Sequence, residues 1–317
     1  MSVDPTPHLI VPFAQCSGGD WLQAVAPLKL QNLAQLLHGM KLIDTDKGQI
    51  DSLSPAHERV LARALGLTAC ADGLIPLAAF AALEAHQPNA SSNEGWAFMT
   101  PCHWAMGREH ATLTDPASLE LNEADSRTLL ADMQPYFATE GITLHYQQPT
   151  RWLAQGEIFK NLPTASLDRV LGRNVDRWLP ASKVIKLLQN EMQMLLYTHS
   201  VNDGRAAKDQ RSVNSFWVSG SGALNGQVQA HLKTDLGKPL GQAMLANNWS
   251  AYAKAWLQLD ACDIAQLLAQ QKSSHTVRIS LCGESNAMTF ETAKHSVMTK
   301  IRHVLSPKPL INLLKQL

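Results

Sequence analysis

Dense clusters of basic residues are missing from this 317-residue sequence. Lys and Arg together number 27, and Asp and Glu also number 27, so the formal net charge is zero. Proteins that bind nucleic acid usually carry a basic stripe that neutralises phosphates. The even charge balance therefore predicts that nucleic acid is not a partner.

Long apolar runs are also missing. The first apolar stretch, Leu9 to Ala14, is much shorter than the roughly 20 residues that cross a bilayer, and no later stretch approaches that length. A signal peptide needs a basic start and a longer apolar region, whereas this N-terminus carries Asp4 and no Lys or Arg before the run. We therefore expect a cytoplasmic protein with no membrane partner.

Paired cysteines are missing as well. The five cysteines are far apart and odd in number, and none forms a Cys-x-x-Cys motif: Cys16, Cys70, Cys102, Cys262 and Cys282. Secreted domains that depend on disulfides carry denser, even-numbered sets. Reduced thiols, as expected in a cytoplasm, are the simplest interpretation.

What the sequence does contain is typical of an α/β fold. Hydrophobic residues make up 45% of the chain and charged residues 17%, which is enough apolar mass for a full core. The apolar run at the N-terminus predicts a buried strand, and leucines at helical spacing follow it between Leu28 and Leu37. The last third again alternates between strand and helix patterns, from Val213 to Phe290, and a Pro-interrupted helix is predicted over Ile301 to Leu317.

The middle of the chain has a different pattern. A polar stretch, His86 to Glu94, has the composition of a linker. Beyond it the patterns predict two strands, a helix and two more strands, which form a small α+β lobe. We therefore predict three segments: residues 1–94 and 181–317 form a core, and residues 95–180 form an inserted lobe. A long amphipathic helix, Lys183 to Thr198, is expected to begin the second core segment.

One segment carries a family resemblance. Residues 198–222 read THSVNDGRAAKDQRSVNSFWVSGSG. This resembles the signature of the archaeal-type cofactor-independent phosphoglycerate mutases, a branch of the alkaline phosphatase superfamily. The signature is His-x-Val-Asn-x-x-Arg, followed by Asn, a hydrophobic strand and Gly-x-Gly. The resemblance implies an alkaline-phosphatase-like core sheet flanked by helices, with a small inserted α+β lobe.

Weaker similarities extend along the chain. Residues 32–36 (NLAQL) look like the superfamily's Pro-Asn-Leu-Asp-x-Leu helix, and residues 73–79 (GLIPLAA) are similar to a Gly-Pro-Leu-Glu-Ala turn. In overall texture the chain also resembles the bacterial RpfE-type regulatory proteins, which are short relatives of these mutases.

The departures from the mutase pattern concern its two divalent cations. The resemblance implies that an Asp-Gly pair ends the first strand, but Phe13-Ala14 stands there, and Cys282-Gly283-Glu284 stands where a late Asp-His pair belongs. No Asp-His dipeptide and no His-x-His motif occurs in the sequence. Asp260 and Asp263 lie one turn apart on a predicted helix and are interpreted as a solvated face. Because such cations need several converging ligands, we expect neither a metal nor another cofactor.

The nucleophile of the mutases is a Ser that opens a helix. Ser54 is the nearest candidate, because it precedes a predicted helix that ends at Leu65-Gly66. Without a metal its hydroxyl would need an adjacent base, and His57 lies three residues on. A helix N-cap explains Ser54 completely, and we favour that interpretation. Its chemical role stays open.

The signature's polar residues form the predicted ligand-binding group: His199, Asn202, Arg205 and Asn214, with Arg173 facing the same cleft. An Arg with amides and an imidazole suits a small phosphorylated or carboxylate ligand. In the alternative interpretation the two asparagines cap turns and Arg205 pairs with an acid such as Asp203. Arg173 then belongs to a solvated loop.

These features together predict a catalytically inactive, phosphoglycerate-mutase-like regulatory protein that acts by binding a ligand or a protein partner. One alternative is an active metal-dependent mutase or phosphatase. Another is a purely structural partner subunit. Metal content distinguishes the first two interpretations, and a co-purifying protein would indicate the third.

Overall fold

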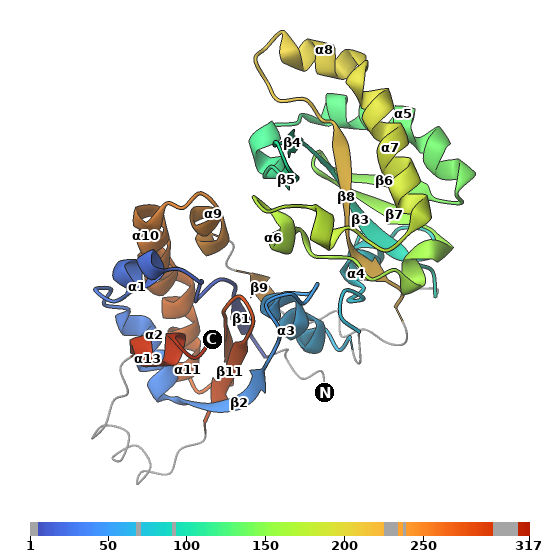
Figure 1. Cartoon of the computed structure of the whole chain (residues 1–317). Helices are drawn as coiled ribbons and strands as arrows, with labels where there is room; N and C mark the ends of the chain where they lie inside the picture. Colours follow the sequence, from blue (N-terminus) through green and yellow to red (C-terminus); the bar gives the residue numbers. More distant parts are fainter. Residues whose placement is uncertain (1–5, 68–70, 91–92, 225–233, 237–238, 294–309) are drawn as a thin grey trace. The chain divides into compact units, whose positions relative to one another are not determined.

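The computed structural model describes residues 6–67, 71–90, 93–224, 234–236, 239–293 and 310–317, with the backbone alone at 234–236. The chain forms two compact units, and the elements of each are labelled in Figure 1. Unit 1 contains residues 1–51, 55–66 and 229–317, and unit 2 contains residues 52–54 and 67–228. Each unit has its own sheet and its own apolar core.

Unit 1 is built on a mixed five-stranded sheet in the order β2-β11-β10-β1-β9. Strand β1 runs parallel to both of its neighbours, β10 and β9, whereas β11 is antiparallel to β10 and β2. The strands are β1 (His8–Val11), β2 (Met40–Asp46), β9 (Thr234–Leu236), β10 (Arg278–Cys282) and β11 (Ala287–Thr292).

Helices cover both faces of this sheet. Alternation along β1 sends Leu9 and Val11 to the larger apolar cluster, and it sends Ile10 to the opposite face against α3 (Ala56–Ala64). The larger cluster contains apolar residues of all the other helices of unit 1. These are α1 (Gly19–Val25), α2 (Gln31–His38), α9 (Pro239–Leu245), α10 (Trp249–Leu259), α11 (Ala265–Lys272) and α13 (Leu310–Leu314). A π-helical turn, Asp260–Ile264, joins α10 to α11.

Unit 2 is built on an antiparallel four-stranded sheet in the order β6-β7-β3-β8, beside a two-stranded β4-β5 ribbon. The strands are β3 (Trp96–Cys102), β4 (Trp104–Met106), β5 (Ala111–Leu113), β6 (Thr143–Gln148), β7 (Arg151–Gln155) and β8 (Ser215–Gly222).

Two long helices bury one face of this sheet (Figure 1). They are α5 (Glu123–Thr139) and α7 (Lys183–Tyr197), and their apolar residues form one cluster with Met99, Trp152 and Phe216 of the strands. Helix α4 (Leu77–Glu84) contacts β3 and β8, and α6 (Leu167–Val170) contacts β8. Helix α8 (Ser200–Ala206) follows α7, and three short 3-10 turns complete the unit: Pro116–Leu119, Glu157–Asn161 and Asp176–Trp178.

The structure confirms the predicted α/β class, with sheets flanked by helices. Its division differs from the expected 95–180 lobe, because unit 2 extends over 67–228. The cause is packing: β8 pairs with β3, α7 belongs to the same apolar cluster, and α4 packs on both strands. The positions 94 and 180 expected to be boundaries therefore lie inside unit 2.

The C-terminal helix predicted over residues 301–317 falls partly outside the described residues, and α13 is its described part. Within the described part of the chain, no helix combines the length and the apolar character that crossing a membrane requires.

Candidate functional site

The first candidate site lies where β1 and β10 end, in unit 1. Ligands of open α/β sheets commonly bind at the carboxyl ends of parallel strands. Ala14 N donates to Cys282 O at 2.8 Å, so the chain three residues beyond β1 is still bonded to the end of β10. The segment 13–17 and the turn 282–286 therefore meet at this edge, where the mutase resemblance implies metal ligands.

Phe13 fills the end of β1 with an apolar ring. Its side chain is only 9% exposed, and its ring lies 5.4 Å from that of His57. A Cβ added at Gly241 of α9 would lie 2.8 Å from Phe13 Cδ2, so that helix packs directly on the ring. The backbone of Phe13 has a φ of 56°, a conformation that L-residues rarely adopt. Phe13 is thus a packed core residue and offers no ligand.

The carbonyl of Phe13 is also engaged. Tyr252 of α10 donates its hydroxyl to Phe13 O at 2.5 Å, and Trp21 Nε1 donates to Tyr252 Oη at 3.2 Å. The Cys16 thiol donates to the same carbonyl at 3.6 Å. Burial raises the pKa of Tyr252, and it raises the pKa of Cys16 to about 12. Both groups therefore keep their protons at neutral pH and serve as hydrogen-bond donors.

Glu284 lies in the turn after β10, and it is 8% exposed. Its Oε2 accepts a hydrogen bond from Ser17 N at 3.1 Å and a second from Ser17 Oγ. The carboxylate thus fastens the loop before α1 to the turn after β10. A side chain held in this way has a clear structural role.

The turn after β10 is tightly packed. A Cβ added at Gly283 would lie 2.7 Å from Leu317 O and 2.9 Å from Gln15 Oε1. Asn286 N donates to Leu317 O at 3.2 Å. Backbone of the C-terminal segment therefore lies against this strand end, together with Gln15.

Metal-ligating side chains do not gather at this edge. Within the residues that the structure describes, no three His, Cys, Asp or Glu side chains lie close enough together to hold a metal ion. The acid at hand, Glu284, is bonded to Ser17. The described arrangement offers hydrogen-bond donors and apolar surface.

The helix that follows Ser54 begins one residue later than expected, so Pro55 and not Ser54 occupies its N-cap position. The cap of α3 is Pro55, without a side-chain hydrogen bond. Ser54 Oγ instead accepts from Gly73 N at 2.9 Å, and Ser54 N donates to Asp72 Oδ1 at 2.9 Å. The hydroxyl is buried, at 3% exposure. These contacts join residue 54 to the segment 72–73 within unit 2. A chemical role for Ser54 stays open.

The second candidate site is the signature group in unit 2. His199 is the N-cap of α8, where its Nδ1 accepts from Val201 N at 3.1 Å. Its Nε2 donates to Asp132 Oδ2 of α5 at 2.9 Å. This pair of contacts assigns the proton to Nε2. Both ring nitrogens are thus engaged inside the unit.

The Asn202 side chain forms three hydrogen bonds with backbone, and they use both of its N–H donors. Its Nδ2 donates to Leu196 O at 2.7 Å and to Val213 O at 2.8 Å, and its Oδ1 accepts from Val213 N at 2.9 Å. The side chain is 8% exposed. Asn202 therefore joins the end of α7 to the residue that precedes β8 by two positions.

Arg205 and Asn214 also bond to backbone. Arg205 Nε donates to Arg211 O at 2.7 Å and Nη2 donates to Leu119 O at 2.5 Å, in a side chain that is 1% exposed. Burial lowers the pKa of Arg205, which still leaves a guanidinium charged near neutrality. Asn214 exchanges two hydrogen bonds with the backbone of Trp104, at 2.7 and 3.0 Å.

The structure thus brings four of the five predicted residues into one region, around α8 and the start of β8. Arg173 lies apart from them, half-buried in the loop after α6, where Arg173 N donates to Val170 O at 2.9 Å. No ion pair between Arg205 and an acid is found among the described side chains. Their ligand-binding role stays a prediction, and their contacts support a structural one.

Two groups at these sites were not predicted from the sequence. Tyr252 holds the end of β1, and Asp132 orients His199. Both are more than 60 residues from their partners, and a tyrosine or an acid on an amphipathic helix has no distinguishing local pattern. Tyr252 and Asp132 could have been identified only from knowledge of which segments contact each other in the fold.

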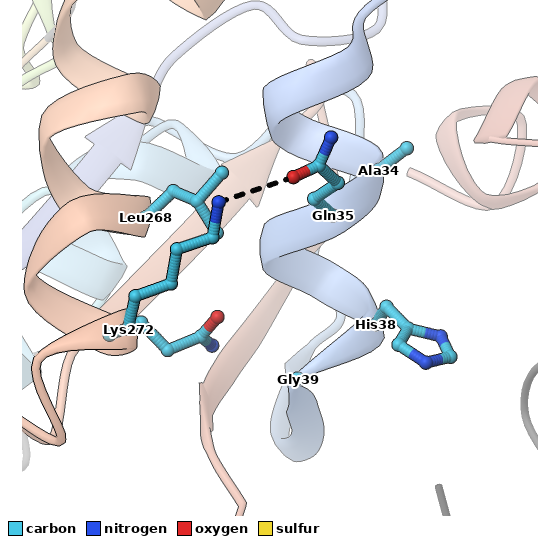
Figure 2. A pocket seen from close by; sticks show the side chains of 7 residues that line it. Ala34, Gln35, His38, Gly39, Leu268 and Lys272 are labelled. Atoms are coloured by element: carbon cyan, nitrogen blue, oxygen red, sulfur yellow. Dashed lines mark hydrogen bonds between the residues drawn. The ribbon is translucent and has the colours of Figure 1, made fainter. Parts of the chain in front are cut away.

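A shallow groove between α2 and α11 is the third candidate (Figure 2). Its volume is about 470 Å³. Lys272 Nζ lies 3.4 Å from Gln35 Oε1 across it, and Gln271 Nε2 donates to Leu36 O at 3.2 Å. Figure 2 shows His38 directed away from Lys272. The lining is Ala34, Gln35, His38, Gly39, Leu268, Gln271 and Lys272. It offers amides and one amine, without a nucleophile beside a base.

Comparison with known proteins gives limited support. No family model matches the chain, and no curated protein matches it. Among solved structures, the chain is similar to a cofactor-independent phosphoglycerate mutase from Thermoplasma acidophilum, with 12% identity and a TM-score of 0.35 over 98% of this chain and 99% of that one. It is also similar to the PH0037 protein from Pyrococcus horikoshii, with 9% identity and a TM-score of 0.42 over 92% and 88%. At such low values these likenesses do not bear on activity.

Proposed function

We propose that this chain is a phosphoglycerate-mutase-like protein that does not transfer phosphoryl groups and that acts by binding. The proposal rests on the mutase signature in residues 198–222 and on the end of β1. There Phe13 is packed between Gly241 and His57, and its carbonyl is bonded to Tyr252. A two-metal phosphoryl-transfer site needs carboxylates at that point.

The single observation that carries the proposal is the packing of Phe13. A dication at this position would have to displace an apolar ring and break the Tyr252 hydrogen bond, with no carboxylate gained in exchange. Glu284 would have to leave Ser17 before it could act as a ligand. The strand end therefore offers no carboxylate for a metal ion, and the packing around Phe13 also disfavours one.

Regulation by binding is the role that such an altered site favours, as in the RpfE-type proteins that the chain resembles. We further propose a cytoplasmic location and either a protein partner or a small anionic ligand. For the ligand, the proposed contacts are Arg205 with Asn202 and Asn214, although each of these already bonds to backbone. A phosphate would have to compete with those carbonyls.

The test combines metal content with thermal unfolding. Full-length protein purified without chelator should contain well under one equivalent of manganese or zinc per chain. Its melting temperature should not change when millimolar manganese is added, because only a bound ligand stabilises the native state by mass action.

Two equivalents of manganese per chain, with a melting temperature that falls on adding chelator, would favour the active enzyme. Phosphate and a phosphorylated three-carbon acid are tested in the same assay. A rise in melting temperature that is smaller in Arg205→Lys supports the small anionic ligand. If neither compound raises the melting temperature, a protein partner remains as the proposed mode of action.

A further inference from the structure

An exposed apolar stripe runs along helix α7. Leu187, Met194 and Tyr197 are 51%, 78% and 87% exposed, and Lys183 and Asn190 are also exposed. From Lys183 to Tyr197 these five positions are spaced alternately by four and three residues. Spacing of this kind places side chains along one seam of a helix with a 3.5-residue repeat. In heptad terms, Leu187 and Met194 occupy a positions, and Lys183, Asn190 and Tyr197 occupy d positions.

The opposite side of the same helix is buried. Ile185, Leu188 and Met192 belong to the apolar core of unit 2 and are at most 1% exposed. Helix α7 is therefore held in place by its own unit, and its outward seam is formed before any partner arrives. The usual cost of ordering a helix on association does not apply.

We propose that the seam of α7 pairs with α7 of a second copy of this chain, with the helices parallel and in register. Each seam residue then meets its own counterpart, so that Leu187 packs on Leu187 and Met194 on Met194. Asn190 meets Asn190, and the two amides can bond to each other across the two-fold axis. A single Asn in such a seam is known to fix register and the number of strands.

Charges beside the seam match this arrangement. In parallel pairs a g residue faces the e residue five positions later on the partner helix. Lys186 occupies a g position, and Glu191, five residues later, occupies the e position. A parallel dimer thus gains the Lys186–Glu191 ion pair twice. Neither side chain forms an ion pair among the residues that the structure describes.

An antiparallel arrangement is less favourable for the same seam. When the helices run in opposite directions, a positions face d positions, so Asn190 would face Leu187 or Met194. Its buried amide would then lack a partner, which is unfavourable for a polar group removed from water. The self-matching amide and the Lys186–Glu191 spacing both select the parallel register. The dimer proposal uses no residue of the strand end of unit 1, so it does not depend on whether that site is catalytic.

The pair is short and should be of moderate strength. Helix α7 has 15 residues, about 22 Å of helix, so the buried area belongs to the small, reversible class of interfaces. Sedimentation velocity of the full chain should show a concentration-dependent shift from 34.7 kDa toward twice that mass.

Substitutions on the seam test the assignment. Met194→Glu should weaken the dimer by at least ~10-fold, because two like charges would meet in the seam. Met106→Glu is the matched control, because Met106 is 79% exposed but lies on β4, and it should leave the dimer unchanged. Both side chains are exposed, so both variants should fold, and circular dichroism checks this.

Charge exchange tests the parallel register. Lys186→Glu and Glu191→Lys should each weaken self-association, since each creates like-charge contacts in a homodimer. An equimolar mixture of the two variants should restore dimers, because both ion pairs re-form between unlike chains. A wild type that stays monomeric at the highest concentration that sedimentation can follow, or a dimer insensitive to Met194→Glu, would overturn the proposal. Failure of the mixture to recover would refute the parallel register.

Discussion

At the scale of single residues, Asn202 of α8 joins two parts of unit 2 through its side-chain amide. The sequence identified Asn202 through its spacing from His199 and Arg205, and that spacing has a structural cause. The residue bonds to the end of α7 and to Val213 at the same time. From the sequence, an amide that binds a ligand and an amide that bonds to its own chain are indistinguishable, because both need the same residue type.

Asn202→Ala should lower the free energy of unfolding by about 3 kcal/mol, because three backbone groups lose their partner inside the core. Urea unfolding followed by circular dichroism measures the change. Asn161→Ala is the control, since Asn161 is exposed at the end of a 3-10 turn of the same unit, and it should change stability by less than about 0.5 kcal/mol. If Asn202→Ala is as stable as the wild type and only abolishes a phosphate-induced rise in melting temperature, the residue is a ligand contact.

His8 gives a second prediction at this scale, which concerns pH. Burial and the nearby charge of Arg278 lower the pKa of His8 from 6.5 to about 4. Its Nε2 lies 2.8 Å from Ser280 Oγ, and Nδ1 has no hydrogen-bond partner among the described residues. The folded state therefore binds this proton less readily than the unfolded state. Its stability is complete above pH 6.5 and falls as the pH drops toward 4.

The loss attributable to His8 should reach about 3 kcal/mol at pH 4, given 1.4 kcal/mol per pKa unit. Unfolding free energies between pH 4 and 7.5 measure it. His8→Gln, which can still bond to Ser280, should flatten that dependence, and His110→Gln at an exposed position should not. An identical pH profile for the wild type and His8→Gln would contradict the assignment.

The elements follow the sequence where their apolar periodicity is strong. Strand β1, helix α7 and the strands β3, β7 and β10 were all predicted from patterns of buried residues, because each of them has a face in a core. Strand β2 was not predicted. It is an edge strand whose residues beyond Met40 are mainly exposed, so no hydrophobic alternation marks it.

Asp260 shows how one element can stabilise another across a long separation in sequence. The prediction of a solvated face was wrong for this residue, which is 6% exposed. Its Oδ1 accepts from Leu33 N at 2.7 Å and its Oδ2 accepts from Asn32 N at 3.2 Å. The start of α2 has no side-chain cap of its own. Asp260, in a π-helical turn 228 residues away, supplies the capping acceptors.

Asp260→Ala should destabilise unit 1 by about 1–2 kcal/mol, the usual effect of removing an N-cap acceptor, and more if the amides stay dry. Hydrogen exchange should show faster exchange at Asn32 and Leu33. Asp263→Ala, at an exposed position one turn on, is the matched control with little expected effect. Equal effects of the two variants would argue against the capping role.

At the scale of the whole molecule, the chain passes between its two units more than once. Residues 52–54 belong to unit 2 although the residues on both sides of them belong to unit 1. A division made along the sequence places boundaries at changes of pattern, whereas β8 and α7 join unit 2 through pairing with β3 and packing on the sheet. Pairing across more than 100 residues has no local signal, so the extent of unit 2 could not be predicted.

The same limit applies to the candidate site. The sequence alone indicated that Phe13-Ala14 stands where the mutase pattern has an Asp-Gly pair. The contacts that hold Phe13 come from Tyr252, Gly241 and His57, which are distant in sequence. These contacts hold Phe13 in the core of unit 1, and this packing is the basis for proposing a binding protein.

Turnover is the most direct measurement of that proposal. The full chain would be incubated with phosphoglycerate in the presence of saturating manganese, and interconversion of the two phosphate positions would be followed by phosphorus NMR, with and without chelator. With Phe13 in the place of a metal-binding acid, we predict no conversion above the uncatalysed rate in either sample. Conversion that requires manganese and is abolished by chelator would contradict the account and restore an active phosphoglycerate mutase.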